Sequence, residues 1–176
     1  MSTPDKASEP QPEAGVGSGQ GLIKPTPFKS VAQFFAFGFG SGLSPKAPGT
    51  VGTLAAVPIY WYLADTGLVV YTAVVLISAC VGIYICGVAS RQLKTHDHPG
   101  IVWDEFVGFW ITMWAVPVSI PWLVAGFVVF RVFDIAKPWP ISVLDKRVHG
   151  GLGIMIDDVV AGLAACGTLH LALWMA

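Results

Sequence analysis

The chain has 176 residues, of which 54% are hydrophobic and 12% are charged, and its mean hydropathy is +0.66. Values this apolar lie outside the usual range of soluble domains and predict a membrane protein. The net charge of −1 carries no basic excess of the kind that nucleic-acid-binding domains show, so no nucleic-acid partner is expected.

Residues 1–27 are expected to form a disordered tail. The first twenty are rich in Pro, Gly, Ser and Glu and contain no apolar block, so they can bury too little surface to offset the entropy lost on ordering. They also lack the basic start and the apolar core of a secretory signal. Residues 28–176 are expected to form a single helical domain.

Four long apolar segments follow and predict an all-α, membrane-associated helical bundle. No strand-like alternation competes with helix in them. The second segment is the clearest spanning candidate, because at about 1.5 Å per residue it is long enough to cross a hydrocarbon core of about 30 Å. The segments are residues 47–64, 68–90, 106–130 and 159–176.

The third segment is broken by Pro117 and Pro121, since proline inside a helix removes a hydrogen bond and clashes with the preceding turn. It could be one kinked span or a short helical hairpin. The hairpin would bring every Lys and Arg of the chain to one side of the membrane, so the positive-inside rule favours it. Its arms are too short to cross a bilayer, and we expect the bundle to be partly embedded.

Two acid pairs stand beside apolar segments in the same local pattern. Asp104-Glu105 in IVWDEFVG and Asp157-Asp158 in IMIDDVVAG are flanked by apolar residues and followed by glycine. We expect each pair at the head of an apolar helix on one membrane face, where carboxylates could supply oxygen ligands to Mg²⁺. The alternative is a helix-end role in which the acids complement the N-terminal dipole. The repetition of the pattern favours the metal site.

The segment RVFDIAKPWPI places Arg131, Asp134 and Lys137 three residues apart, a spacing that predicts one side of a helix ending at the Pro-Trp-Pro sequence. Such cations can be plain ion-pair partners of the acids. Beside a metal cluster, they would also suit the oxygens of a phosphate.

The loop GFGSGLSPKAPGT combines glycines, hydroxyls and Lys46 ahead of a helix. This composition could wrap an anion with backbone N–H groups, although such a loop can also be only a turn. It is not a Walker A loop, because Ala47 follows the lysine. The sequence His96-Asp97-His98 has no further ligands at zinc-finger spacing and is expected to be a polar connecting loop.

Four motifs in this order, GFGSGLSPKAPGT, IVWDEFVGFWI, RVFDIAKPWPI and HGGLGIMIDDVVAG, resemble those of the phosphatidylglycerophosphatase A family. The resemblance extends from about residue 36 to the C-terminus. It implies that residues 28–176 are an Mg²⁺-dependent lipid-phosphatase domain of the bacterial inner membrane. Such an enzyme converts phosphatidylglycerophosphate to phosphatidylglycerol and inorganic phosphate, and we expect the active site on the cytoplasmic face.

Each charged motif residue then receives an expected role. Asp134 would be a further metal ligand or the base that orients the attacking water, and either direct attack by water or an aspartyl-phosphate intermediate fits this set. The cations expected to neutralise the phosphoryl oxygens are Lys46, Arg131 and Lys137. The residues expected to hold Mg²⁺ are Asp104, Glu105, Asp157 and Asp158.

The competing hypothesis is a non-enzymatic membrane protein, either an ion or proton pathway or a lipid-binding protein. A proton relay needs polar groups spaced through the bilayer. The opposite half of the expected membrane region has almost none, which argues against transport. The sequence carries no indication of an oligomeric state.

Overall fold

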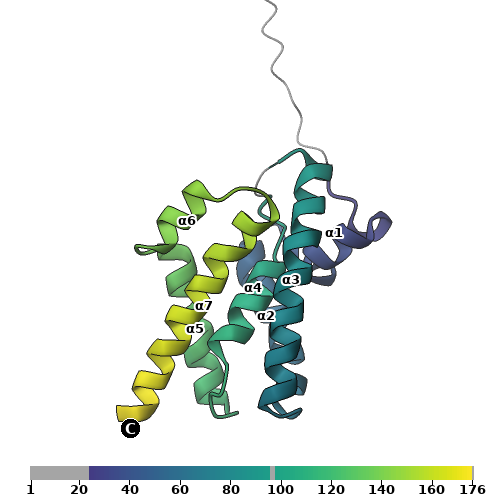
Figure 1. The fold of residues 1–176 in the computed structure, drawn as a ribbon. Coiled ribbons are helices and arrows are strands. Elements are labelled where there is room, and N and C mark those ends of the chain that lie inside the picture. The colour runs from purple at the N-terminus through teal and green to yellow at the C-terminus, as the bar shows by residue number, and fades with distance from the viewer. Residues whose placement is uncertain (1–23, 96–97, 176) are drawn as a thin grey trace, which may run out of the picture.

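The computed structural model describes residues 24–95 and 98–175, and all regular secondary structure in these ranges is helical (Figure 1). The all-α prediction is therefore confirmed for the described part of the chain. Residues 1–23 of the expected tail lie outside it, as do His96 and Asp97 of the expected polar loop. The elements are η1 (Pro27–Lys29), α1 (Val31–Ala36), η2 (Gly38–Leu43), α2 (Pro48–Ala64), α3 (Leu68–Leu93), α4 (Trp103–Thr112), α5 (Ile120–Ala136), α6 (Ile141–Arg147) and α7 (Gly150–Met175).

The four apolar segments correspond to α2, α3, the pair α4 and α5, and α7. The third segment is the hairpin that the charge pattern favoured, because α4 ends at Thr112 and α5 begins at Ile120. Pro117 lies in the connection, and Pro121 lies in the first turn of α5. A proline is tolerated there, since the first N–H groups of a helix have no intrahelical partner.

The prediction that Asp157 and Asp158 stand at the head of the last helix is wrong. Helix α7 begins at Gly150, about two turns earlier. Glycines disfavour helix, but here they pack tightly: a Cβ on Gly151 would collide with the carbonyl of Ile83 in α3. Tertiary packing thus outweighs local propensity. Because the helix dipole acts within the first turn, it cannot explain this acid pair.

Helix α4 lies at the centre and is held by its neighbours on several sides. The indole of Trp110 donates a hydrogen bond to the carbonyl of Ala56 in α2 at 3.1 Å, and the hydroxyl of Tyr71 in α3 donates to the carbonyl of Trp110 at 2.6 Å. Against α7, Gly108 faces Gly162, and a Cβ on Gly162 would contact the Gly108 backbone. Two small residues allow this close helix crossing.

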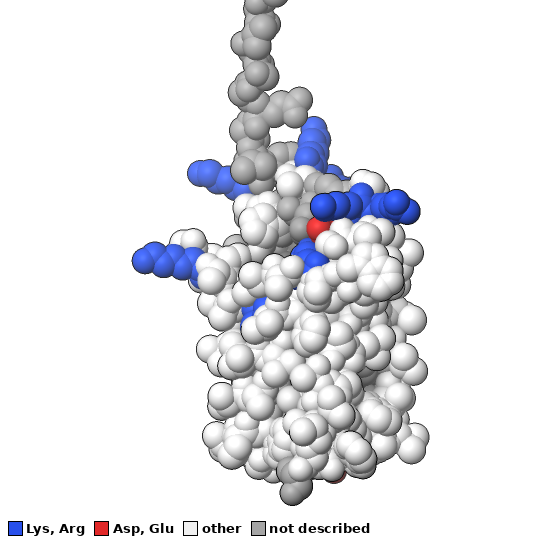
Figure 2. Space-filling view, turned by 90° about the vertical axis from the view of Figure 1, so that its left-hand side faces the viewer, with Lys and Arg blue, Asp and Glu red and all other residues white. Residues whose placement is uncertain are grey.

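Two helices, α3 and α7, are long and apolar enough to cross a membrane. Helix α3 is not a buried core helix, because apolar side chains such as Val69, Ile77 and Tyr84 are exposed. On the face that Figure 2 shows, Lys and Arg gather at one end and the rest of the body is almost entirely uncharged. This distribution is consistent with the expected membrane-associated bundle whose cations share one side.

Candidate active site

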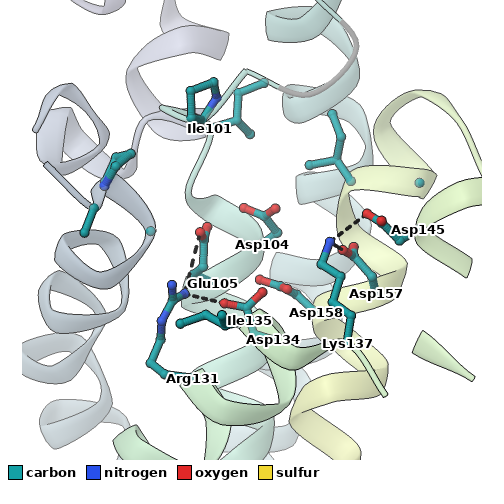
Figure 3. Close-up of a pocket in the computed structure, with 16 residues that line it drawn as sticks. Ile101, Asp104, Glu105, Arg131, Asp134, Ile135, Lys137, Asp145, Asp157 and Asp158 are labelled. Atoms are coloured by element: carbon teal, nitrogen blue, oxygen red, sulfur yellow. Dashed lines mark hydrogen bonds and ion pairs between the residues drawn. The ribbon is translucent and has the colours of Figure 1, made fainter. Parts of the chain in front are cut away.

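A cavity of about 450 Å³ opens between the start of α2, the start of α4, the end of α5 and the first half of α7 (Figure 3). Its lining includes seven of the eight charged residues that the sequence assigned to a site. The exception is Lys46, which is exposed, although its neighbours Ala47, Pro48 and Gly49 do line the cavity. The charged lining residues are Asp104, Glu105, Arg131, Asp134, Lys137, Asp145, Asp157 and Asp158.

Three carboxylates converge at the centre of the cavity. Asp104, Glu105 and Asp158 each offer an oxygen, and these oxygens all lie within 4.8 Å of one another. We call them the carboxylate triad. Each has one buried oxygen that finds no hydrogen-bond donor among the described residues. Burying a polar atom without a partner costs free energy, so the triad fits a bound cation.

Helix α4 places two members of the triad. Asp104 and Glu105 lie in its first turn, and the buried residues that flank them in sequence, Trp103 and Phe106, stack with ring centroids 5.6 Å apart. The Trp103 indole also donates a hydrogen bond to the carbonyl of Ser78 in α3, at 3.1 Å. The aromatic residues therefore anchor this turn and leave its acids facing the cavity.

Burial sets the protonation of these two acids in the metal-free protein. Desolvation raises the pKa of Asp104 well above its usual range and raises that of Glu105 to about 7. The carboxylates of Glu105 and Asp158 further raise the pKa of Asp104, whereas a hydrogen bond with Asp104 and then the Arg131 guanidinium moderate the rise in the pKa of Glu105. The site as it stands thus carries fewer negative charges near neutral pH than its composition indicates.

The cations lie on opposite sides of the triad, as Figure 3 shows. Arg131 forms an ion pair with Asp134, which confirms that they share one side of α5, and its Nη1 lies 3.9 Å from Oε1 of Glu105. The Arg131 Nε atom is buried and has no acceptor among the described residues. A buried donor of this kind is available to an anion in the cavity.

Lys137 occupies the other side. It follows the end of α5 in a left-handed conformation with φ of 41°, so it lies beyond the helix and not on the predicted helical face. Its Nζ atom is 2.7 Å from Oδ2 of Asp157 and 2.6 Å from Oδ1 of Asp145. Asp157 is therefore paired with a cation and is not a member of the triad. Its expected role as a fourth Mg²⁺ ligand stays a prediction.

Asp145 is a site residue that the sequence analysis missed. It lies in α6, directly before Lys146 and Arg147, where an acid resembles an ordinary surface charge. No spacing rule connects it with Lys137, because the Pro-Trp-Pro connection and the start of the short α6 lie between the two residues. The signal was only its place between two motifs that do line the cavity.

The wall formed by the glycine loop approaches the triad closely. A Cβ on Gly49 would collide with the Glu105 carboxylate and come within 3.3 Å of the Arg131 guanidinium. The N-termini of α2 and α4 both open towards the cavity. Because free N–H groups and the helix dipole make such ends favourable for anions, the cavity has a centre whose carboxylates suit a cation and a rim that suits an anion.

Comparisons with known proteins agree on one family. The model of the family described as phosphatidylglycerophosphatase A matches residues 34–173. The chain is 50% identical over 136 residues to phosphatidylglycerophosphatase A of Escherichia coli, covering 77% of this chain and 79% of that protein. It is 43% identical over 132 residues to the Haemophilus influenzae protein of the same name, covering 74% and 81%.

A third relative, from Bacteroides thetaiotaomicron, is named provisionally as a phosphatidylinositol-3-phosphatase. It is 38% identical over 149 residues, covering 78% of this chain and 91% of that protein. No solved structure matches the chain.

Proposed function

The chain belongs to the phosphatidylglycerophosphatase A family, and from that premise we propose that it hydrolyses phosphatidylglycerophosphate to phosphatidylglycerol and inorganic phosphate. Membership of a phosphatase family favours this reaction over the non-enzymatic ion pathway and the lipid-binding protein. The observation that carries the proposal is the carboxylate triad with Arg131 and Lys137 on its two sides.

The triad alone would repel a phosphate, since like charges in a poorly solvated cavity interact strongly. A divalent cation held by these carboxylates would remove that conflict. We propose Mg²⁺, held by Asp104, Glu105 and Asp158, because it prefers carboxylate oxygens and keeps several waters. When bound, it would lower the pKa of a water and offset charge on the phosphoryl oxygens.

The other charged residues supply binding and orientation. Arg131 and Lys137 would donate hydrogen bonds to the non-bridging oxygens from opposite sides of the triad, which matches charge spread over the phosphoryl group in the transition state. Asp134, held by its ion pair with Arg131, would orient the attacking water. Lys46 keeps its expected role only if its exposed side chain turns towards the phosphate.

The reaction would take place at the cytoplasmic face of the inner membrane. The cavity lies at the end of the bundle where the cations gather, and the positive-inside rule assigns that end to the cytoplasm. A phosphate on a diacyl lipid lies at headgroup depth. The exposed apolar sides of α3 and α7 would then contact the lipid chains.

Phosphate release by the purified protein tests the proposal. Phosphatidylglycerophosphate with Mg²⁺ should yield inorganic phosphate, and EDTA should abolish the release. Phosphatidylinositol 3-phosphate serves as a second substrate because of the third relative. A rate on that lipid equal to or above the rate on phosphatidylglycerophosphate would overturn the substrate assignment, and release that persists in EDTA would overturn the metal.

Direct attack by water and the aspartyl-phosphate route leave different stereochemical configurations at phosphorus. Direct in-line attack by water inverts a chiral phosphate, whereas an aspartyl-phosphate intermediate needs two displacements and retains the configuration. With Asp134 as the residue that orients water, we propose inversion. Retention would instead make a cavity aspartate the nucleophile.

A further inference from the structure

The residues from η1 to η2 expose apolar side chains that the helical bundle does not bury. We call residues 27–43 the aromatic segment. Phe28 and Val31 are each 76% exposed, and Phe39 is 43% exposed. Soluble monomers rarely expose contiguous apolar patches of this kind without a binding function.

The aromatic segment is ordered by its own ring contacts. Phe34 lies 5.5 Å from Phe35 and 5.6 Å from Phe39, measured between ring centroids, in edge-to-face arrangements. Phe35 and Phe39 in turn contact Trp103, at 6.1 and 6.0 Å. The exposed rings therefore belong to a built surface that continues into the first turn of α4.

Hydrogen bonds fix the height of this surface along the bundle. Gln92, one residue before the end of α3, accepts hydrogen bonds from Ser30 Oγ at 2.9 Å and from Gln33 Nε2 at 2.8 Å. Trp103, the ring partner of the segment, directly precedes Asp104 of the carboxylate triad. In Figure 1, α1 projects sideways from the upper part of α3. The segment thus lies beside the bundle at the level of the cavity.

Along the chain, the charged residues within and next to the aromatic segment are all basic. Lys24, Lys29 and Lys46 are exposed, and no acidic residue occurs between Lys24 and Ala64. Asp65, the next acid, follows α2 at the opposite end of the bundle, where α3 begins. Segments that lie in the interface of an anionic bilayer typically combine lysines with exposed aromatic rings.

We propose that the aromatic segment lies in the headgroup layer of an anionic bilayer and sets the depth of the cavity. Phe28 and Val31 enter the boundary between headgroups and lipid chains, while Lys24 and Lys29 contact lipid phosphates. Because the segment is tied to both Gln92 and Trp103, its depth determines the depth of the adjacent triad. This surface goes beyond the proposed hydrolysis and does not depend on which lipid is the substrate.

Spin labels on the full-length protein in lipid nanodiscs test this placement. Phe28→Cys and Val31→Cys are each labelled with a nitroxide in a Cys80→Ser/Cys166→Ser background, in which the remaining Cys86 is fully buried. Both labels should collide more often with oxygen than with a water-soluble nickel chelate. Lys94→Cys is the aqueous control, and Ile77→Cys, exposed in the middle of α3, is the bilayer control.

Two outcomes would overturn the placement. Nickel accessibility at 28 and 31 equal to that at 94 would put the segment in water. Protection from both reagents would mean that protein, such as a second copy of the chain, covers it. Neither outcome would alter phosphate release, so failure here is distinct from failure of the proposed function.

Lipid charge separates the roles of the rings and the lysines. In nanodiscs of neutral lipid, the Val31→Cys label should lie closer to water than in nanodiscs containing anionic phospholipid, because the lysines lose their partners. Adding Lys24→Gln and Lys29→Gln should remove that difference. If the Val31→Cys label lies at the same depth in neutral and in anionic nanodiscs while both lysines are present, the lysines do not bind anionic lipid and that part of the proposal is refuted.

Discussion

The ammonium of Lys137 donates a hydrogen bond to Asp157 at 2.7 Å, while the adjacent Asp158 belongs to the carboxylate triad. Two aspartates that are equivalent in sequence therefore have different partners. Successive residues on a helix point about 100° apart, so neighbours need not share a site.

Asp158→Asn should weaken Mg²⁺ binding far more than Asp157→Asn. The first substitution removes a triad ligand, and we expect at least about 100-fold higher Mg²⁺ for half-maximal phosphate release, beyond the ~10–100-fold typical of supporting residues. The second frees Lys137 from one partner and should mainly raise KM. Mg²⁺ titrations at several substrate concentrations separate the two effects. If both variants lose Mg²⁺ affinity equally, Asp157 is a metal ligand as well.

Asp145→Ala should raise KM several-fold with little change in stability. The pair of Asp145 with Lys137 is partly exposed, at 36% and 28% of the two side chains, and such pairs contribute only about 0–1 kcal/mol. Its effect should come through the position of the Lys137 ammonium. Asp145→Asn keeps an acceptor oxygen and should retain most of the substrate affinity. If both variants lose kcat and unfold at lower temperature, Asp145 is simply structural.

The metal-free protein should lose stability as the pH rises towards 7. Burial raises the pKa of Glu105 to about 7 from 4.5, so the folded state holds its proton more tightly than the unfolded chain does. The contribution of Glu105 to the free energy of unfolding is therefore fully present below about pH 4.5 and is lost progressively as the pH rises to about 7. Thermal unfolding in EDTA across this range measures the effect.

Mg²⁺ should reverse that trend, because the ion needs the ionised carboxylate and its affinity increases with pH. Glu105→Gln should lessen the pH dependence in EDTA, and the remainder should come from Asp104, whose pKa burial also raises. A wild-type unfolding midpoint in EDTA that rises over the same range would contradict the assigned pKa.

Gly162→Ala should disrupt the crossing of α4 and α7. The added Cβ meets the Gly108 backbone, and overpacking at a tight contact costs about 1–3 kcal/mol. Because the crossing sets the triad, activity should fall as well. Gly167→Ala is the matched control on the same helix: nothing lies within 4 Å of its Cβ, and alanine should stabilise the helix by up to about 1 kcal/mol. Equal unfolding midpoints for the two variants would refute this role.

Much of the fold was predictable because its signals are local. Long apolar segments, the prolines at 117 and 121 and the one-sided distribution of lysine and arginine indicated helices α2, α3 and α7 and the α4–α5 hairpin. The short helices α1 and α6 carry no such periodic signal. The early start of α7 was missed because Gly151 is helical through its packing on α3, which no local propensity encodes.

The sequence by itself determined most of the charged groups of the site, since acid pairs and three-residue spacings are visible along the chain, but it did not reveal Asp145. Only the tertiary structure decided how those groups are divided. It places Asp104 and Glu105 beside Asp158, and it pairs Asp157 and Asp145 with Lys137. Lys46 does not line the cavity. The physical reason is that these partners lie on different helices, and their directions depend on the α4–α7 crossing and on the turn after α5, which are set by packing between elements.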